Sequence, residues 1–164
     1  VEMLKIALRH KPYSVCIVPE KRKEITTEGG LNLNYKEKFL KESIIKMRKK
    51  GIRVSLFIEP NFKDINKAKK LNSNCIEIHT GKICDLINKK KPYIKELNKI
   101  KKAVDLAHKL GLEVHAGHGL TYNSSKIISK IKNIREFNIG HFLVGESIFI
   151  GLKKVILNFK NILK

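Results

Sequence analysis

Two stretches of the sequence repeat one local pattern, KKGIRVSLF at 49–57 and KLGLEVHAG at 109–117. Each follows apolar residues at helical spacing, and each contains a glycine and then a run in which apolar residues alternate. A glycine at that point is typical of the end of a helix, and the alternation is typical of a strand. A chain that passes repeatedly from helix to strand predicts a parallel sheet with right-handed crossovers, because each helix returns the chain to the same end of the sheet.

The same periodicities extend over the rest of the chain and predict the order αβαβαβαβαβα. The predicted strands lie at 14–19, 52–58, 75–79, 112–117 and 137–144. The predicted helices lie at 2–10, around 40–47, from an N-cap at 61 to before 72, from 93 to before 111, around 124–132, and as one final helix over 148–159.

A parallel sheet is either an open layer or a closed barrel, and the polar residues help to choose. Glu77 stands between Ile76 and Ile78, where an open sheet covered by helices on both faces requires an apolar residue. No G-x-G-x-x-G segment follows any strand, so the usual dinucleotide signal is absent. Charged or imidazole groups follow every strand, as when strands converge on one site. We therefore predict an α/β fold of the TIM (β/α)8 barrel family, with residues 1–164 as a single domain that is the C-terminal part of a barrel and holds about five of the eight units.

Composition narrows the function classes. A chain of 164 residues with 42% hydrophobic residues has the size of one domain with a real core. No apolar run reaches bilayer length and no signal sequence is recognisable, so we expect a cytoplasmic protein without membrane association. The three cysteines show no metal spacing and are expected to be reduced thiols.

The formal net charge of +20 raises the possibility of a nucleic-acid partner. However, nearly all the positive charge is lysine, spread over every predicted helix, whereas arginine is the better reader of bases and phosphates. We therefore do not expect nucleic acid to be the partner. The five arginines are Arg9, Arg22, Arg48, Arg53 and Arg135.

The segment AGHGL places Gly117 and Gly119 on either side of His118. Glycines let backbone amides approach an anion closely, and a free imidazole titrates near neutrality, which suits proton transfer. The segment NIGH adds Gly140 and His141 after the last predicted strand, where TIM barrels commonly bind phosphate. We predict a phosphorylated small molecule as ligand. The alternative is that the glycines only form tight turns and that His118 bonds to the backbone.

Three further features allow two interpretations each. Glu77, if buried, either bonds to polar neighbours or stabilises a developing positive charge. His115 and His118 with Glu77 or His79 would make a mixed zinc site, but no Asp or H-E-x-x-H completes it, so no metal is predicted; His115 more simply orients its neighbour or fills the interior. The polar segment 20–34 is either a lid over substrate or a disordered surface loop.

Several stretches together resemble the pyridoxine 5′-phosphate synthase family of TIM-barrel enzymes, over nearly the whole chain and in order. They are CIVPEKRKEITTEGGLNLN, GIRVSLFIEP, IEIHTG, EVHAGHGLTY and FNIGHFLVGESIFIGL. The resemblance implies condensation of 3-amino-2-oxopropyl phosphate with 1-deoxy-D-xylulose 5-phosphate, no cofactor, and a homo-octamer. It also implies that His118 is the catalytic proton donor, that Glu77 stabilises the transition state, and that Thr26 contacts the deoxyxylulose phosphate. Gly119, Gly140 and His141 match the positions that hold the amino-ketone phosphate.

One departure from the family is large. Its N-terminal segments N-x-D-H, H-L-R-E-D-R-R-H and L-E-M-A, which supply proton acceptors and three strands, have no counterpart here. We therefore expect residues 1–164 alone to be inactive, the native product to be longer, and the strands at 14–19 and 137–144 to be unpaired edges that invite aggregation. Two other functions stay open: a different phosphate-binding barrel enzyme, such as an isomerase or aldolase, and a noncatalytic basic module that binds nucleic acid.

Overall fold

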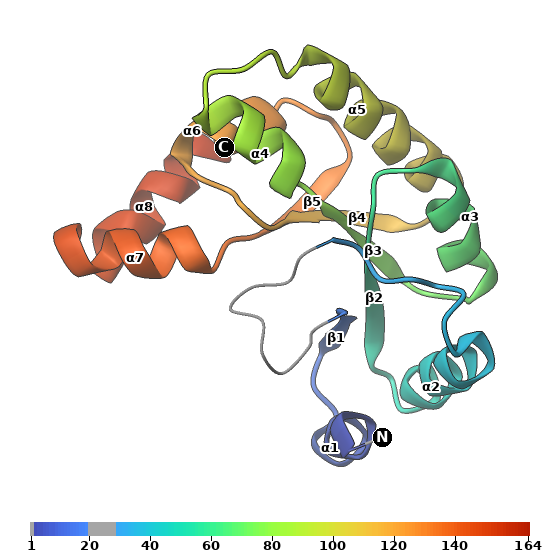
Figure 1. Cartoon of the computed structure of the whole chain (residues 1–164). Helices are drawn as coiled ribbons and strands as arrows, with labels where there is room; N and C mark the ends of the chain where they lie inside the picture. The colour runs from blue at the N-terminus through green and yellow to red at the C-terminus, as the bar shows by residue number, and fades with distance from the viewer. Residues whose placement is uncertain (1, 20–28) are drawn as a thin grey trace.

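A computed structural model describes residues 2–19 and 29–164. At its centre is a sheet of five parallel strands that neighbour one another in chain order (Figure 1). The strands are β1 (Ser14–Ile17), β2 (Arg53–Ile58), β3 (Cys75–His79), β4 (Glu113–Gly117) and β5 (Ile134–Asn138). The predicted parallel α/β fold is therefore confirmed. Within the described residues the sheet is not closed, and β1 and β5 form its two edges.

Helices cover one face of this sheet, and α2, α3 and α5 lie in an arc outside it (Figure 1). The helices are α1 (Glu2–His10), α2 (Glu37–Lys49), α3 (Phe62–Lys70), α4 (Gly81–Asn88), α5 (Ile94–Lys109), α6 (Tyr122–Ile128), α7 (His141–Ile150) and α8 (Leu152–Ile162). Over the described residues, no helix combines the length and the apolar character that crossing a bilayer requires.

The two faces of the sheet differ because neighbouring residues of a strand point to opposite sides. Ile76 and Ile78 of β3 are fully buried in the core that the sheet shares with helical residues such as Ile65 and Ile100. Glu77, between them, lies on the other face, which we call the inner face, and is only 8% exposed. This asymmetry is the one that a barrel wall requires.

The structure differs from the prediction at three elements. Helix α4 was not predicted, since its eight residues carry only a short apolar pattern between a strand and the next helix. The last strand was predicted at 137–144, but β5 ends at Asn138 and the apolar residues that follow belong to α7. The predicted single final helix is two, because the chain leaves helical geometry at Gly151, whose φ is 83°.

Smaller differences concern the ends of elements. The strand predicted at 14–19 is ordered as a strand only over Ser14–Ile17. The helix predicted around 124–132 is Tyr122–Ile128, and it begins earlier because Thr121 caps it in a reciprocal capping box with Ser124. Asn61 caps α3 as predicted, its side chain accepting the Asp64 amide.

Candidate active site

One cavity of about 890 Å³ opens at the carboxyl ends of the strands. Five residues that the sequence singled out line it: Glu77, His118, Gly119, Gly140 and His141. They come from three separate stretches of the chain, and the fold brings them to one place. The shared location of Gly119 and Gly140 was predicted and is confirmed. Thr26 lies outside the described residues, and so do residues 20–28 of the segment 20–34 that was considered as a lid.

His118 occupies a strained turn directly after β4. Its φ is 77°, a value that only a minority of non-glycine residues adopt, and Gly119 follows with a φ of 75°. The buried Thr80 holds this turn, because its hydroxyl donates to the carbonyl oxygens of both Gly117 (2.8 Å) and His118 (2.7 Å). Strain kept in place by surrounding hydrogen bonds is common at functional sites. The His118 side chain is half-buried at the cavity wall.

Gly119 and Gly140 permit close approach in different ways. A Cβ atom on Gly119 would lie 3.1 Å from Cβ of Cys84 in α4, so this turn packs tightly on its neighbour. A Cβ on Gly140 would meet nothing within 4 Å. Gly140 is the N-cap of α7 and makes no side-chain cap. The first amides of a helix have no acceptor within the helix and favour an anion, so the start of α7, including His141, is suited to hold phosphate.

Glu77 is held in a fixed position on the inner face. Its Oε2 accepts from Nδ2 of Asn138 (2.7 Å) and from the Cys16 thiol (3.4 Å). A Cβ on Gly117 would come within 1.8 Å of Glu77 Oε1, so residue 117 must be glycine for Glu77 to lie there. Burial raises the pKa of the Glu77 carboxyl, although its two hydrogen bonds oppose that change. Burial also raises the pKa of the Cys16 thiol, which therefore stays protonated as the donor.

His79 lies beside His118 but has a different environment. Its Nδ1 is 2.9 Å from Oε1 of Glu59, the residue that follows β2. The ring of His79 lies against those of Phe57 and His118, with centroids 5.3 Å and 4.9 Å away. The hydrogen bond to His79 is the main reason that the pKa of the Glu59 carboxyl is lowered. Glu59 therefore remains a carboxylate near neutral pH.

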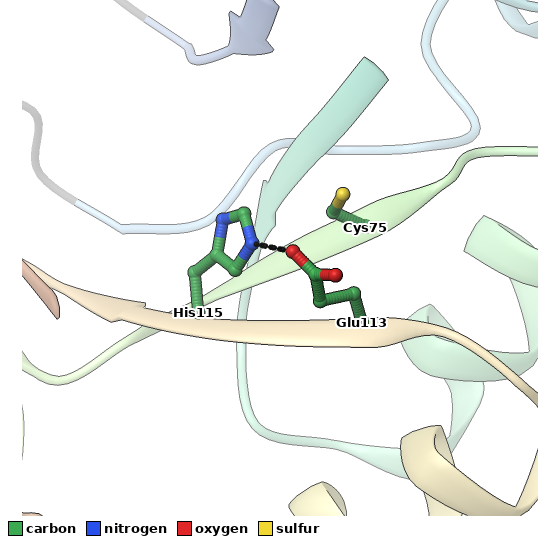
Figure 2. A group of neighbouring side chains, drawn as sticks. All are labelled: Cys75, Glu113 and His115. Carbon is green, nitrogen blue, oxygen red and sulfur yellow. Dashed lines mark hydrogen bonds and ion pairs between the residues drawn. The ribbon is translucent and has the colours of Figure 1, made fainter. Parts of the chain in front are cut away.

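The mixed zinc site that the sequence left as an alternative, His115 and His118 with Glu77 or His79, is not among the donor sets that the described residues form. The one set of three metal-type donors within reach of one another there is Cys75, Glu113 and His115 (Figure 2). Its donors are already engaged: the Arg53 guanidinium lies 2.8 Å from Glu113 Oε1 and 3.1 Å from Cys75 Sγ. A guanidinium at that distance supplies the positive charge, so the set fits an ion-pair network better than a metal site.

Arg53, Cys75 and Glu113 of this network are the first residues of β2, β3 and β4, whereas His115 pairs in register with Glu77. His115 contributes Nε2 at 2.9 Å from Glu113 Oε1, and both His115 and Arg53 lower the pKa of the Glu113 carboxyl. Burial raises the pKa of the Cys75 thiol. His115 therefore fills the interior, one of its two predicted roles. His10 and His108 are exposed on helices.

Sequence reasoning did not assign the partners of these residues. Asn138, Cys16 and Thr80 hold the site, yet each is an ordinary strand or turn residue by type. Alternation does place Cys16 on the inner face with Glu77, and the NIGH segment begins with Asn138. Which inner-face residues touch depends on the stagger of the strands, including the register shift between β4 and β5 at Val114/His115, and no sequence pattern reveals that shift.

An α/β domain with a cavity at the carboxyl ends of parallel strands, lined by apolar residues and a few polar ones, is the arrangement of barrel enzymes that act on small molecules. Comparison with known proteins gives the family. The model of the pyridoxal phosphate biosynthesis protein PdxJ family matches residues 1–164. This chain belongs to that family.

Three relatives are each named pyridoxine 5′-phosphate synthase. That of Pelagibacter ubique is 59% identical over 161 residues, which cover 98% of this chain and 67% of the relative. That of Zymomonas mobilis is 52% identical, covering 93% of this chain and 59% of the relative. That of Roseobacter denitrificans is 46% identical, covering 99% of this chain and 66% of the relative. The chain thus spans roughly two thirds or less of the length of these relatives.

Proposed function

We propose that the protein containing this chain is a pyridoxine 5′-phosphate synthase. It condenses 3-amino-2-oxopropyl phosphate with 1-deoxy-D-xylulose 5-phosphate and releases pyridoxine 5′-phosphate, phosphate and water. The observation that carries the proposal is that Glu77, His118, Gly119, Gly140 and His141 line a single cavity. These are the residues of the chain that match the family's motifs, and they come together from three strand ends.

The cavity offers a division of roles. Backbone amides at Gly119 and at the start of α7 bind the phosphate of the amino-ketone, with His141 beside them. His118 gives a proton to a departing oxygen, which imine formation and the later dehydrations require. Thr26, which belongs to the segment not described, contacts the phosphate of the second substrate.

Glu77 stabilises the positive charge on the nitrogen of the protonated imine. Asn138 and Cys16 hold its Oε2, and the absence of a side chain at Gly117 leaves room for Oε1. In a buried place, a fixed carboxylate stabilises a nearby positive charge more strongly than it does in water. No metal or organic cofactor has a role in this scheme.

The partners that we propose are small phosphorylated substrates and further copies of the chain, in a homo-octamer as in the family, and the compartment is the cytoplasm. We propose no nucleic-acid partner. Exposed apolar side chains on α7 and α8, among them Ile148 and Phe149, support self-association.

The test is direct. The full-length gene product that contains this chain is incubated with both phosphate substrates, and pyridoxine 5′-phosphate is measured by chromatography and mass spectrometry. Product formation is expected, whereas residues 1–164 alone should give none. Folded full-length protein without product would refute the proposal. In that case, RNA binding with a steep salt dependence would favour the basic binding module, and turnover of a single phosphorylated substrate would favour an isomerase or aldolase.

A further inference from the structure

The pair Glu59 and His79 stands beside His118 and has no part in the roles described above. His79 is the last residue of β3, and its side chain is 12% exposed. Because the Glu59 carboxylate only accepts, His79 Nδ1 carries the proton in their 2.9 Å hydrogen bond. The other ring nitrogen of His79 is Nε2. It is buried and has no hydrogen-bond partner among the described residues.

The rings of His79 and His118 meet above Gly81, the first residue of α4. A Cβ atom at Gly81 would lie 2.7 Å from His79 Nε2 and 2.7 Å from His118 Cδ2. Both rings therefore rest on a position that tolerates no side chain. The centroid of the Phe57 ring lies 5.3 Å from that of His79 and 6.5 Å from that of His118, so the three rings form one cluster. Any rotation of the His79 ring changes the surface against which His118 packs.

Glu59 Oε1 has a second partner, the backbone amide of Gly30 at 3.0 Å. A Cβ on Gly30 would come within 2.4 Å of the Glu59 nitrogen, and the Leu31 amide donates to the carbonyl of Phe57. The chain from residue 29 onward is thus fastened to the end of β2. One carboxylate oxygen joins this segment to the His79 ring.

We propose that Glu59 and His79 are positioning residues for His118. Glu59 fixes the orientation and tautomer of His79, and the His79 ring together with Gly81 sets the orientation of the His118 imidazole that donates the proton. Neither residue needs to touch the reacting atoms. This role rests on the function proposed above for His118.

Glu59 contacts both the His79 ring and the Gly30 amide, and substitutions in the full-length protein test these two contacts separately. His79→Phe keeps a ring against Phe57 and His118 but loses the bond to Glu59, so we expect kcat to fall about 10- to 100-fold with KM within about threefold. Glu59→Ala also frees Gly30, so it should lower kcat similarly and raise KM as well. Glu59→Gln keeps an acceptor for both donors and should retain most of the activity. The matched control is His108→Phe on the exposed side of α5, expected to act like the unchanged protein.

A second readout does not depend on catalysis. Diethyl pyrocarbonate labels accessible imidazoles, and peptide mass spectrometry gives the labelling rate of His118 itself. We expect His79→Phe and Glu59→Ala to change this rate by about threefold or more, while the rate of the His108 peptide in the same samples stays constant. A protein that makes no pyridoxine 5′-phosphate would refute the proposed function, yet the labelling rates would still decide on the pair.

Two results would overturn the positioning role. One is an unchanged kcat together with an unchanged His118 labelling rate in folded His79→Phe. The other, should that variant fail to fold, is the same pair of unchanged values in Glu59→Ala. A fall in both kcat and the His118 labelling rate for His108→Phe would also contradict the positioning role, since the effect would then not depend on contact with His118.

Discussion

The inner face of the sheet has two polar ends, and they use the same residue types differently. Near the amino ends of the strands, Arg53, Cys75, Glu113 and His115 contact one another, and Arg53 and His115 share Glu113 as partner. At the carboxyl ends, Glu77 and His118 face a cavity together with glycines. His115 and His118 are only three residues apart, yet His115 bonds to Glu113 and His118 lines the cavity.

The difference shows what turns a polar residue into a functional one. At the amino ends, charges and hydrogen-bonding groups satisfy one another, which removes the cost of burying them. At the carboxyl ends, the missing side chain of Gly117 leaves room for Glu77 and that of Gly140 leaves open space beside α7, while Glu77 and His118 line a cavity that a ligand can enter. A carboxylate or imidazole therefore acts chemically where glycines surround it, and structurally where charged partners do.

Substitutions of His118 and His115 should differ most in how far they lower kcat/KM. In the full-length protein, His118→Ala should lower kcat/KM by about 10²- to 10⁴-fold, because it removes the proton donor. His115→Asn changes the other end of the sheet and should lower it by less than about fivefold. The rate of pyridoxine 5′-phosphate formation measures both, with the exposed His108→Ala as control. Equal losses in the first two variants would mean that the two ends are not functionally distinct.

The next effect concerns Glu77, where we expect stability and activity to move in opposite directions. Glu77→Gln should reduce kcat by about 10²-fold or more, because the charge that serves the imine is gone. It should also raise the free energy of unfolding at pH 7, by an amount on the order of 1 kcal/mol, since a buried charge is removed. Activity assays and chemical denaturation at several pH values test both.

The pH dependence has a definite sign. The pKa of Glu77 is raised from 4.5 in the folded protein, so above pH 4.5 the native state binds more protons than the unfolded state. The free energy of unfolding should therefore fall as the pH rises from 4.5 through the folded pKa, and this fall should be absent in Glu77→Gln. A variant that is less stable than the original protein at neutral pH would show that Asn138 and Cys16 compensate fully for burial.

The smallest effect belongs to the amino end. Glu113→Gln weakens the bonds to Arg53 and His115, and the side chain is 36% exposed, so solvent screening limits the loss of stability to under about 1 kcal/mol. The pKa of Glu113 is lowered from 4.5, so its contribution is present above that pH and is lost as the pH falls through the folded pKa. Activity should stay within about twofold. Denaturation at pH 7 and at pH 3 measures the stability, and a large loss of activity would contradict the structural role.

Sequence periodicity predicted the fold well where apolar residues recur over a long element. The helix before Gly51 and the helix before Gly111 pass into β2 and β4 as the repeated joint indicated. It failed for residues 137–144, because a short segment whose apolar residues would lie on every side of a helix shows neither a clear helical nor a clear strand period. Residues 142–150 are apolar around the whole helix α7 and read equally well as a strand.

The candidate site was predictable in its residues and not in its contacts. Glu77 and His118 stand out because a carboxylate inside a strand and an imidazole between glycines are rare and specific. The bond from Asn138 to Glu77 and the bond from Glu59 to His79 join residues 61 and 20 positions apart. Such pairs depend on strand register and on loop conformation, which a single sequence does not contain.

The location of a bound phosphate tests whether the cavity at the carboxyl ends of the strands is the substrate site. A crystal structure of the full-length protein with inorganic phosphate, a product of the proposed reaction, would locate the anion. We expect phosphate within hydrogen-bond distance of the amides of Gly119 and of the first turn of α7, beside His118. Phosphate bound instead to Arg53 at the amino ends of the strands, with the cavity at the carboxyl ends empty, would contradict it.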